Sequence, residues 1–309
     1  MLQSESFLIN TFSSHYRQKY GEPVGKLPVD VGVICPNRQY GGCIFCRPAS
    51  FTAGHLDAAD HVLHQIERGK KHLGTGRFKR YLAYFQQETC TALPKNQLLA
   101  TIRMVLKDED CLGLILSTRP DHVPEQLLSE LSALIDTAKK ECLFELGMQT
   151  VHERSLQLLN RNHTFHAVTD AIRRIKDAGP FETGVHLIFG IPGESDDDML
   201  HSLVSACSMG IDALKLHHLQ VIRDTRLHGM YTRGEVEMFT LERYMAFLVS
   251  ALPRIPARVV LHRLWATAHP GLLIAPKWNV LAAQLSKELL KRMQQLGIRQ
   301  GSAISSCQA

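Results

Sequence analysis

The sequence predicts an α/β protein: a partial (β/α)6-type barrel of parallel strands, then a C-terminal extension of a strand, an irregular stretch and a helix. Short apolar runs alternate with longer amphipathic stretches, and several of the runs are apolar throughout, as strands buried on both faces are. About six strand–helix units fit before residue 250, which is too few for a closed eightfold barrel.

The expected strands are rich in Val, Ile, Leu and Phe. In chain order they are 28–34, 80–86, 112–117, 143–148, 183–189, 213–219 and 258–264. Helical patterns separate them, with helix-end signals at Pro124, at Gly179 and from Ser195 to Asp198. After the last strand we expect one long helix to about Leu296, and a frayed tail from Gly297 onward.

Three segments follow from this pattern. They are an N-terminal extension (1–27), a core (28–250) and a basic C-terminal extension (251–309). The first residues show no apolar segment behind a basic start, and the apolar runs are far shorter than the roughly 20 residues of a membrane span. We therefore expect a cytoplasmic protein with no membrane association. In that reducing compartment, closely spaced cysteines are more often metal ligands or catalytic groups than disulfides.

Positive charge is concentrated in two stretches. Residues 251–309 hold eight Lys and Arg against one acid, Glu288, which gives +7 of a total net charge of +5. Residues 68–80 hold six Lys and Arg and no acid. Such stretches suit a polyanion such as RNA, because phosphate contacts release counterions; a solvated helix face is the other interpretation.

Three of the eight cysteines lie within twelve residues, "CPNRQYGGCIFC". Cys35, Cys43 and Cys46 directly follow the first expected strand, on the side where α/β folds place their active sites. The others are isolated, most of them in or beside apolar runs, where we expect ordinary buried thiols; they are Cys90, Cys111, Cys142, Cys207 and, in the tail, Cys307.

Two kinds of metal site are compatible with three thiols. A structural zinc site needs a fourth ligand, which His55 would supply. An iron–sulfur cluster held by three cysteines leaves one iron with an open position, where a substrate or cofactor can bind. The second interpretation implies chemistry and the first does not.

A cysteine triad ending in C-x-x-C after the first strand resembles the radical S-adenosylmethionine (SAM) superfamily. There, three cysteines bind a [4Fe–4S] cluster whose fourth iron is chelated by the amino and carboxylate groups of SAM. The commonest spacing in that family leaves three residues between the first two cysteines. Seven intervene here, as in the branch of bacterial proteins related to the radical SAM subunit of Elongator. Phe45 would pack over the cluster.

Further motifs extend the resemblance: "FQQETCT" (85–91), "LSTRPDHVP" (116–124), "FELGMQTVHERSLQLLNRNHT" (144–164), "GVHLIFGIPGES" (184–195) and "HHLQVIRDTRL" (217–227). The resemblance implies SAM contacts from Gln86, Gln87, Ser117, Gln149, Arg161 and His186. Arg161 would bind the SAM carboxylate, since a guanidinium forks onto a carboxylate. Residues 191–193 and 219–221 would lie near adenine.

The activity implied is that of a radical SAM enzyme. A reduced cluster passes one electron to SAM, and the resulting 5′-deoxyadenosyl radical abstracts hydrogen from a substrate. A one-electron donor of the flavodoxin or ferredoxin kind would be a partner. The basic stretches favour tRNA as the substrate, contacted through the C-terminal extension. A peptide or small metabolite as substrate, or a non-catalytic zinc- or cluster-containing RNA-binding protein, stays open.

Overall fold

The computed structural model describes residues 7–304 except 58 and 76. Its main sheet has seven strands: β1 (Val24–Val29), β2 (Arg80–Phe85), β3 (Cys111–Thr118), β4 (Glu141–Gln149), β5 (Glu182–Phe189), β6 (Ala213–His218) and β8 (Val260–Arg263). Each strand pairs in parallel with the strand before it in this order. The sheet is therefore a curled half-barrel whose carboxyl ends form one rim.

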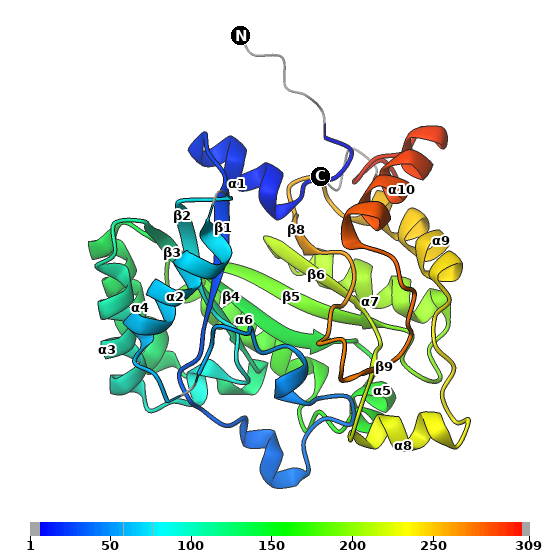
Figure 1. Ribbon diagram of the computed structural model, residues 1–309, viewed down its shortest axis with the longest axis horizontal. Helices are drawn as coiled ribbons and strands as arrows, with labels where there is room; N and C mark the ends of the chain where they lie inside the picture. The colour runs from blue at the N-terminus through cyan, green and yellow to red at the C-terminus, as the bar shows by residue number, and fades with distance from the viewer. Residues whose placement is uncertain (1–6, 58, 76, 305–309) are drawn as a thin grey trace.

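Helices cover the outer face of the sheet, and a short antiparallel pair, β7 (Val221–Ile222) with β9 (Leu273–Ala275), lies apart from it. The helices are α1 (Phe12–Tyr20), α2 (Val62–Gly69), α3 (Lys95–Leu106), α4 (Glu125–Ala138), α5 (Glu153–Leu158), α6 (Phe165–Ala178), α7 (Asp196–Ser208), α8 (Arg226–Thr232), α9 (Leu241–Ala251) and α10 (Ala282–Gln295). Figure 1 shows α1 and α10 on the opposite side of the molecule from the loop that follows β1. The predicted start at Ser195 is confirmed, since its side chain and that of Asp198 form a reciprocal cap on α7.

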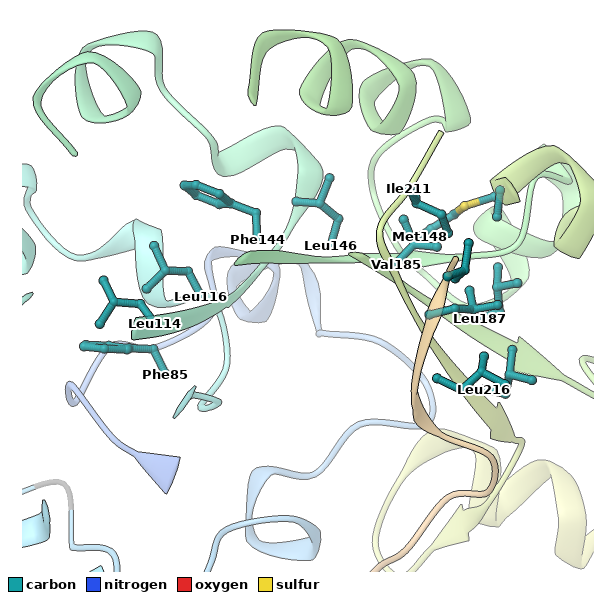
Figure 2. Close-up of a cluster of buried hydrophobic side chains, with 14 of the residues drawn as sticks. Phe85, Leu114, Leu116, Phe144, Leu146, Met148, Val185, Leu187, Ile211 and Leu216 are labelled. Carbon is teal, nitrogen blue, oxygen red and sulfur yellow. The ribbon is translucent and has the colours of Figure 1, made fainter. Parts of the chain in front are cut away.

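The main core lies between the outer face of the sheet and the helices. Figure 2 shows apolar side chains of neighbouring strands on this face, among them Phe85, Leu116, Phe144 and Leu187. Burial of each such side chain contributes about 2 kcal/mol. Because side chains alternate along a strand, the residues between them face the inside of the half-barrel.

The predicted fold class is confirmed, and the segment predicted as a C-terminal strand contributes the seventh strand of the same sheet. The position of the first strand was wrong: it spans Val24–Val29 rather than 28–34. The side chain of Gln65 accepts from the backbone N–H of Asp30 at 2.8 Å and donates to its carbonyl at 2.9 Å. These bonds draw the chain out of the sheet after Val29, so the apolar residues that follow lie in the loop.

The prediction of a frayed tail was also wrong for its described part, residues 297–304. Gln300 is buried; its N–H donates to Leu8 O at 2.9 Å, and its side chain donates to Val259 O at 2.8 Å. The last residues, 305–309, lie outside the described chain. No helix in the described part is long and apolar enough to cross a membrane.

Candidate active site

A cavity of about 230 Å³ is formed inside the half-barrel at the carboxyl rim. Eight of the nine site residues predicted from the sequence line it: Cys35, Cys43, Cys46, Gln86, Ser117, Gln149, Arg161 and His186. Phe45 lines it as well. Gln87 does not, because its side chain turns away and its Nε2 donates to Thr52 Oγ1 at 2.7 Å. Residues that lie on or after five different strands therefore meet in one place.

The loop that carries Cys35, Cys43 and Cys46, called here the cysteine loop, reverses its direction through two consecutive glycines. Residues Pro36–Tyr40 form one turn of 3-10 helix after Cys35, and Gly41 and Gly42 then take φ values of 84° and 69°. Left-handed backbone at two successive positions is costly for any residue other than glycine. This reversal returns the chain to the same cavity, so that all three thiols line it.

Polar groups surround the three sulfur atoms. Thr89 Oγ1 donates to Cys35 Sγ at 3.2 Å, and Arg161 Nη1 donates to Cys43 Sγ at 3.2 Å. Arg38 Nη2 lies 3.6 Å from Cys46 Sγ. Burial, with the neighbouring Cys43, raises the pKa of Cys46 to about 12. A metal that binds this sulfur as thiolate displaces its proton. Hydrogen bonds to sulfur are also a means of tuning iron–sulfur clusters.

The donor set fits an iron–sulfur cubane. A cubane cluster spreads its cysteine ligands over separate irons, whereas one zinc ion needs its ligands around a single point. Within the described residues, no three His, Cys, Asp or Glu side chains are gathered so as to hold a metal ion directly. His55, the fourth ligand of the zinc interpretation, does not line the cavity; its Nε2 lies 3.2 Å from Pro28 O.

Gln149, the last residue of β4, and Arg161, which follows α5, line the cavity together with the three cysteines. Arg161 Nη2 donates to Gly147 O at 2.7 Å. A Cβ on Gly147 would lie 2.8 Å from this nitrogen and 2.9 Å from Gln149 Nε2, so a larger residue would displace the ends of both side chains. Gln149 itself has a φ of 69°, a strained value for a side chain of this kind. Asn160 Nδ2 donates to Gly42 O at 2.7 Å, which ties the segment after α5 to the cysteine loop.

Glu88 is a site residue that the sequence reasoning missed. It accepts a short hydrogen bond from the backbone N–H of Cys35, and an oxygen lies 3.3 Å from Arg38 Nη2. In "FQQETCT", Glu88 and Thr89 rather than Gln87 thus reach the cysteine loop. The available signal was a carboxylate directly after the second strand, on the rim where the cysteines were expected.

A buried carboxylate that contacts two residues of the cavity lining was missed as well. Glu145 on β4 is 1% exposed; its Oε2 accepts from Lys215 Nζ at 2.8 Å and His186 Nε2 at 3.1 Å, and its Oε1 accepts from His262 Nδ1 at 2.8 Å. Burial alone would raise the pKa of Glu145, but the charge of Lys215 and the histidine contacts hold it well below its usual range. His186 is thus a neutral donor within this network, since burial lowers its pKa to about 4.

The fold and this site define a class of α/β protein in which three cysteines line a cavity inside a parallel half-barrel. The sequence model of the Radical SAM superfamily matches residues 29–205, and that of the Radical_SAM C-terminal domain matches residues 211–295. The chain belongs to the radical SAM superfamily. Its cofactors are a [4Fe–4S] cluster and SAM.

Protein YhcC of Escherichia coli K12 is 32% identical over 304 residues, which cover 96% of each chain. A tRNA uridine(34) acetyltransferase of Methanocaldococcus jannaschii is 28% identical over 192 residues, 61% of this chain and 34% of that protein. The solved structure of Methanocaldococcus infernus Elp3, with an N-terminal deletion, superposes with a TM-score of 0.65 at 19% identity. That match covers 90% of this chain and 64% of the other, and it shows a shared fold.

Proposed function

We propose that this radical SAM enzyme acts on a nucleotide of tRNA. The observation that carries the proposal is the similarity, over 192 residues, to a tRNA uridine(34) acetyltransferase. The similarity spans only 34% of that protein, so its acetyl-transfer reaction is not part of the proposal. What we carry over is the class of substrate.

The proposed roles of the cavity residues follow from their positions. When bound, the cluster and SAM supply a 5′-deoxyadenosyl radical that removes a hydrogen atom. Cys35, Cys43 and Cys46 would hold the cluster. Arg161, whose Nη1 donates to Cys43 Sγ at 3.2 Å, would bind the carboxylate of SAM through its guanidinium. Ser117, Gln86 and Gln149 would provide polar contacts to the rest of SAM.

The rim of the cavity is rich in arginine. Residues 35–51 and 220–228, which contribute to its lining, contain four arginines and one acid. Arg47 is held in place by Asp224 Oδ2 at 2.7 Å and by Arg223 O at 3.0 Å, while Arg223 is exposed. Exposed guanidinium groups at a rim suit the phosphates beside a nucleotide that enters the cavity.

Several arginines of the basic C-terminal extension lie away from this rim. Arg258 Nη1 donates to Ile211 O, at the amino end of β6, at 2.9 Å. Arg292 is paired with Glu242 at 2.7 Å and with Glu288 at 2.8 Å. We therefore propose that the rim contacts RNA next to the reacting nucleotide, and that the extension adds contacts farther from it.

The test is anaerobic reconstitution with iron and sulfide, followed by SAM, dithionite in place of the flavodoxin- or ferredoxin-like donor, and bulk tRNA from cells lacking the gene. Chromatography measures 5′-deoxyadenosine, and mass spectrometry measures the nucleosides of the recovered tRNA. We expect tRNA to raise the yield of 5′-deoxyadenosine and a nucleoside to change mass. Cys43→Ala should abolish both, whereas the control Cys207→Ala, at an isolated buried thiol on α7, should retain both.

Two other outcomes would contradict the proposal. Formation of 5′-deoxyadenosine with no response to tRNA and no changed nucleoside would favour a peptide or small metabolite as the substrate. RNA binding without SAM cleavage in the reconstituted protein would favour the non-catalytic alternative.

A further inference from the structure

Strand β8 carries an extra residue that turns two successive side chains into the half-barrel. Its register with β6 pairs Leu214 with Leu261 and then Lys215 with Arg263, so His262 has no counterpart. In a regular strand, neighbouring side chains point to opposite faces, and a bulge of this kind re-aims one of them. Here His262 reaches Glu145 at 2.8 Å while Arg263 lines the cavity.

Arg263 differs from most of the other charged residues of the cavity lining. Arg38 faces Glu88 at 3.3 Å, and Lys215 faces Glu145 at 2.8 Å. The other lining cations with contacts are Arg119, bound to both oxygens of Asp121 at 2.9 and 2.8 Å, and Arg161, which donates to Cys43 Sγ. Arg263 has neither a carboxylate within 4.0 Å nor a side-chain hydrogen bond among residues 7–304 as far as these are described. A cation without a counter-charge in such a cavity is costly unless a ligand supplies one.

A second unpartnered polar group lies beside it. His217, on β6, lines the same cavity, and its Nε2 is buried without a hydrogen-bond partner in the described structure. Its ring stacks on that of His186 with centroids 5.6 Å apart. Arg263 pairs in register with Lys215, and His217 is the next residue of β6 that faces the same side, so the two side chains belong to neighbouring strands. Burial and then the charge of Arg263 lower the pKa of His217 well below its usual range. An unsatisfied buried group of this kind regains its hydrogen bond when a ligand binds.

We propose that Arg263 and His217 form an oxyanion subsite at the floor of the cavity, which binds a carboxylate or phosphate of the substrate. Guanidinium binds either group through two parallel hydrogen bonds, and the imidazole N–H adds a third donor. The half-enclosed setting strengthens these contacts relative to water. The subsite fixes one end of the substrate, so the hydrogen to be removed is held in a single position.

The proposed subsite depends on the proposed function in one respect, namely that the molecule carrying the oxyanion is a tRNA. In a tRNA, the oxyanion is either a carboxylate carried by a modified base or a phosphate of the nucleotide itself. In another substrate, the same two residues bind the same chemical group. The binding test below therefore uses no RNA.

The first measurement is the thermal unfolding midpoint of the reconstituted, SAM-loaded enzyme in sodium acetate, sodium phosphate and sodium chloride at equal ionic strength. A ligand that binds only the folded protein raises the midpoint as its concentration passes the dissociation constant. In the wild type and in Arg254→Gln, a control at an exposed residue, we expect the unfolding midpoint in acetate or phosphate to be higher than the midpoint in chloride. Arg263→Gln should abolish that difference, and Arg263→Lys should keep part of it. A rise with acetate alone identifies a carboxylate, and a rise with phosphate alone identifies a phosphate.

Two outcomes would overturn the subsite. In one, the unfolding midpoint of the wild type is no higher in either oxyanion than in chloride; in the other, Arg263→Gln responds as the wild type does.

The second measurement uses tRNA. Arg263→Gln should lose about ten- to a hundredfold of the tRNA-dependent product, whereas Arg254→Gln should retain it. If the oxyanion effect depends on Arg263 while tRNA has no effect on any variant, the subsite stands and the tRNA proposal fails.

Discussion

Replacing Glu145 with glutamine is expected to destabilise the protein strongly. The carboxylate accepts three hydrogen bonds, from Lys215, His186 and His262, at 2.8 to 3.1 Å. Both Glu145 and Lys215 are nearly inaccessible, at 1% and 3% exposure. Removing one partner of a buried ion pair leaves the other charge uncompensated and costs about 3–5 kcal/mol. We expect the free energy of unfolding to fall by about that amount near neutral pH.

The size of this loss should depend on pH, with a direction set by Lys215. Burial lowers the pKa of Lys215 to about 8 in spite of the opposing charge of Glu145. Without that charge, the pKa falls further and the lysine sheds its proton more easily. The variant should therefore lose most stability at the acidic end of the neutral range, and the deficit relative to wild type should narrow as pH rises toward 9.

The assay is anaerobic urea unfolding followed by circular dichroism, with wild type and variants measured at the same pH. Glu145→Gln/Lys215→Met removes both charges of this pair, and we expect it to recover part of the loss, since Lys26, whose Nζ lies 4.0 Å from Glu145 Oε1, remains. The control is Glu182→Gln on the neighbouring strand. Burial and then Glu141 raise the pKa of Glu182 to about 7, so this side chain is already partly protonated and the change should cost less than about 1 kcal/mol. An equally small loss for Glu145→Gln, or a double variant as unstable as the sum of the singles, would refute the ion-pair reasoning.

Two further predictions concern SAM binding and acid stability. Arg161→Lys should weaken SAM binding to the cluster-loaded protein about tenfold, as measured by calorimetry, because a single ammonium replaces the two-pronged guanidinium. The control Gln87→Ala should change the affinity less than about twofold, since this side chain turns away from the cavity. Unchanged affinity in Arg161→Lys would exclude the proposed contact. Burial lowers the pKa of His218 and of His262 to about 3, so the unfolded chain takes up protons below about pH 6.5 that the folded chain rejects. The free energy of unfolding should therefore decrease as the pH is lowered from about 6.5 to 4.5, by up to about 1.4 kcal/mol per pH unit for each histidine. A urea midpoint that does not change over that pH interval would contradict this assignment.

Much of the active site could be predicted because its residues stand at strand ends. Parallel strands bring all their carboxyl ends to one rim, so any residue placed just after a strand is near every other such residue. The thiols were found in this way, and all three line the cavity. Arg161 follows α5 and was identified only through the resemblance to the radical SAM superfamily. Gln87 shows the limit of the method: adjacent side chains diverge, and the position alone does not determine which of them faces the cavity.

By itself, the sequence determined the fold class, six of the seven strand positions to within a few residues, and the three cysteines on the first loop. These depend on local information, namely apolar periodicity, helix caps and close spacing. Only the tertiary structure decided that Glu145, His186, Lys215 and His262 converge, and that the bulge in β8 turns Arg263 inward. The physical reason is that buried ion pairs and strand register join residues from distant segments. Their partners can be identified only when the strands that carry them lie side by side.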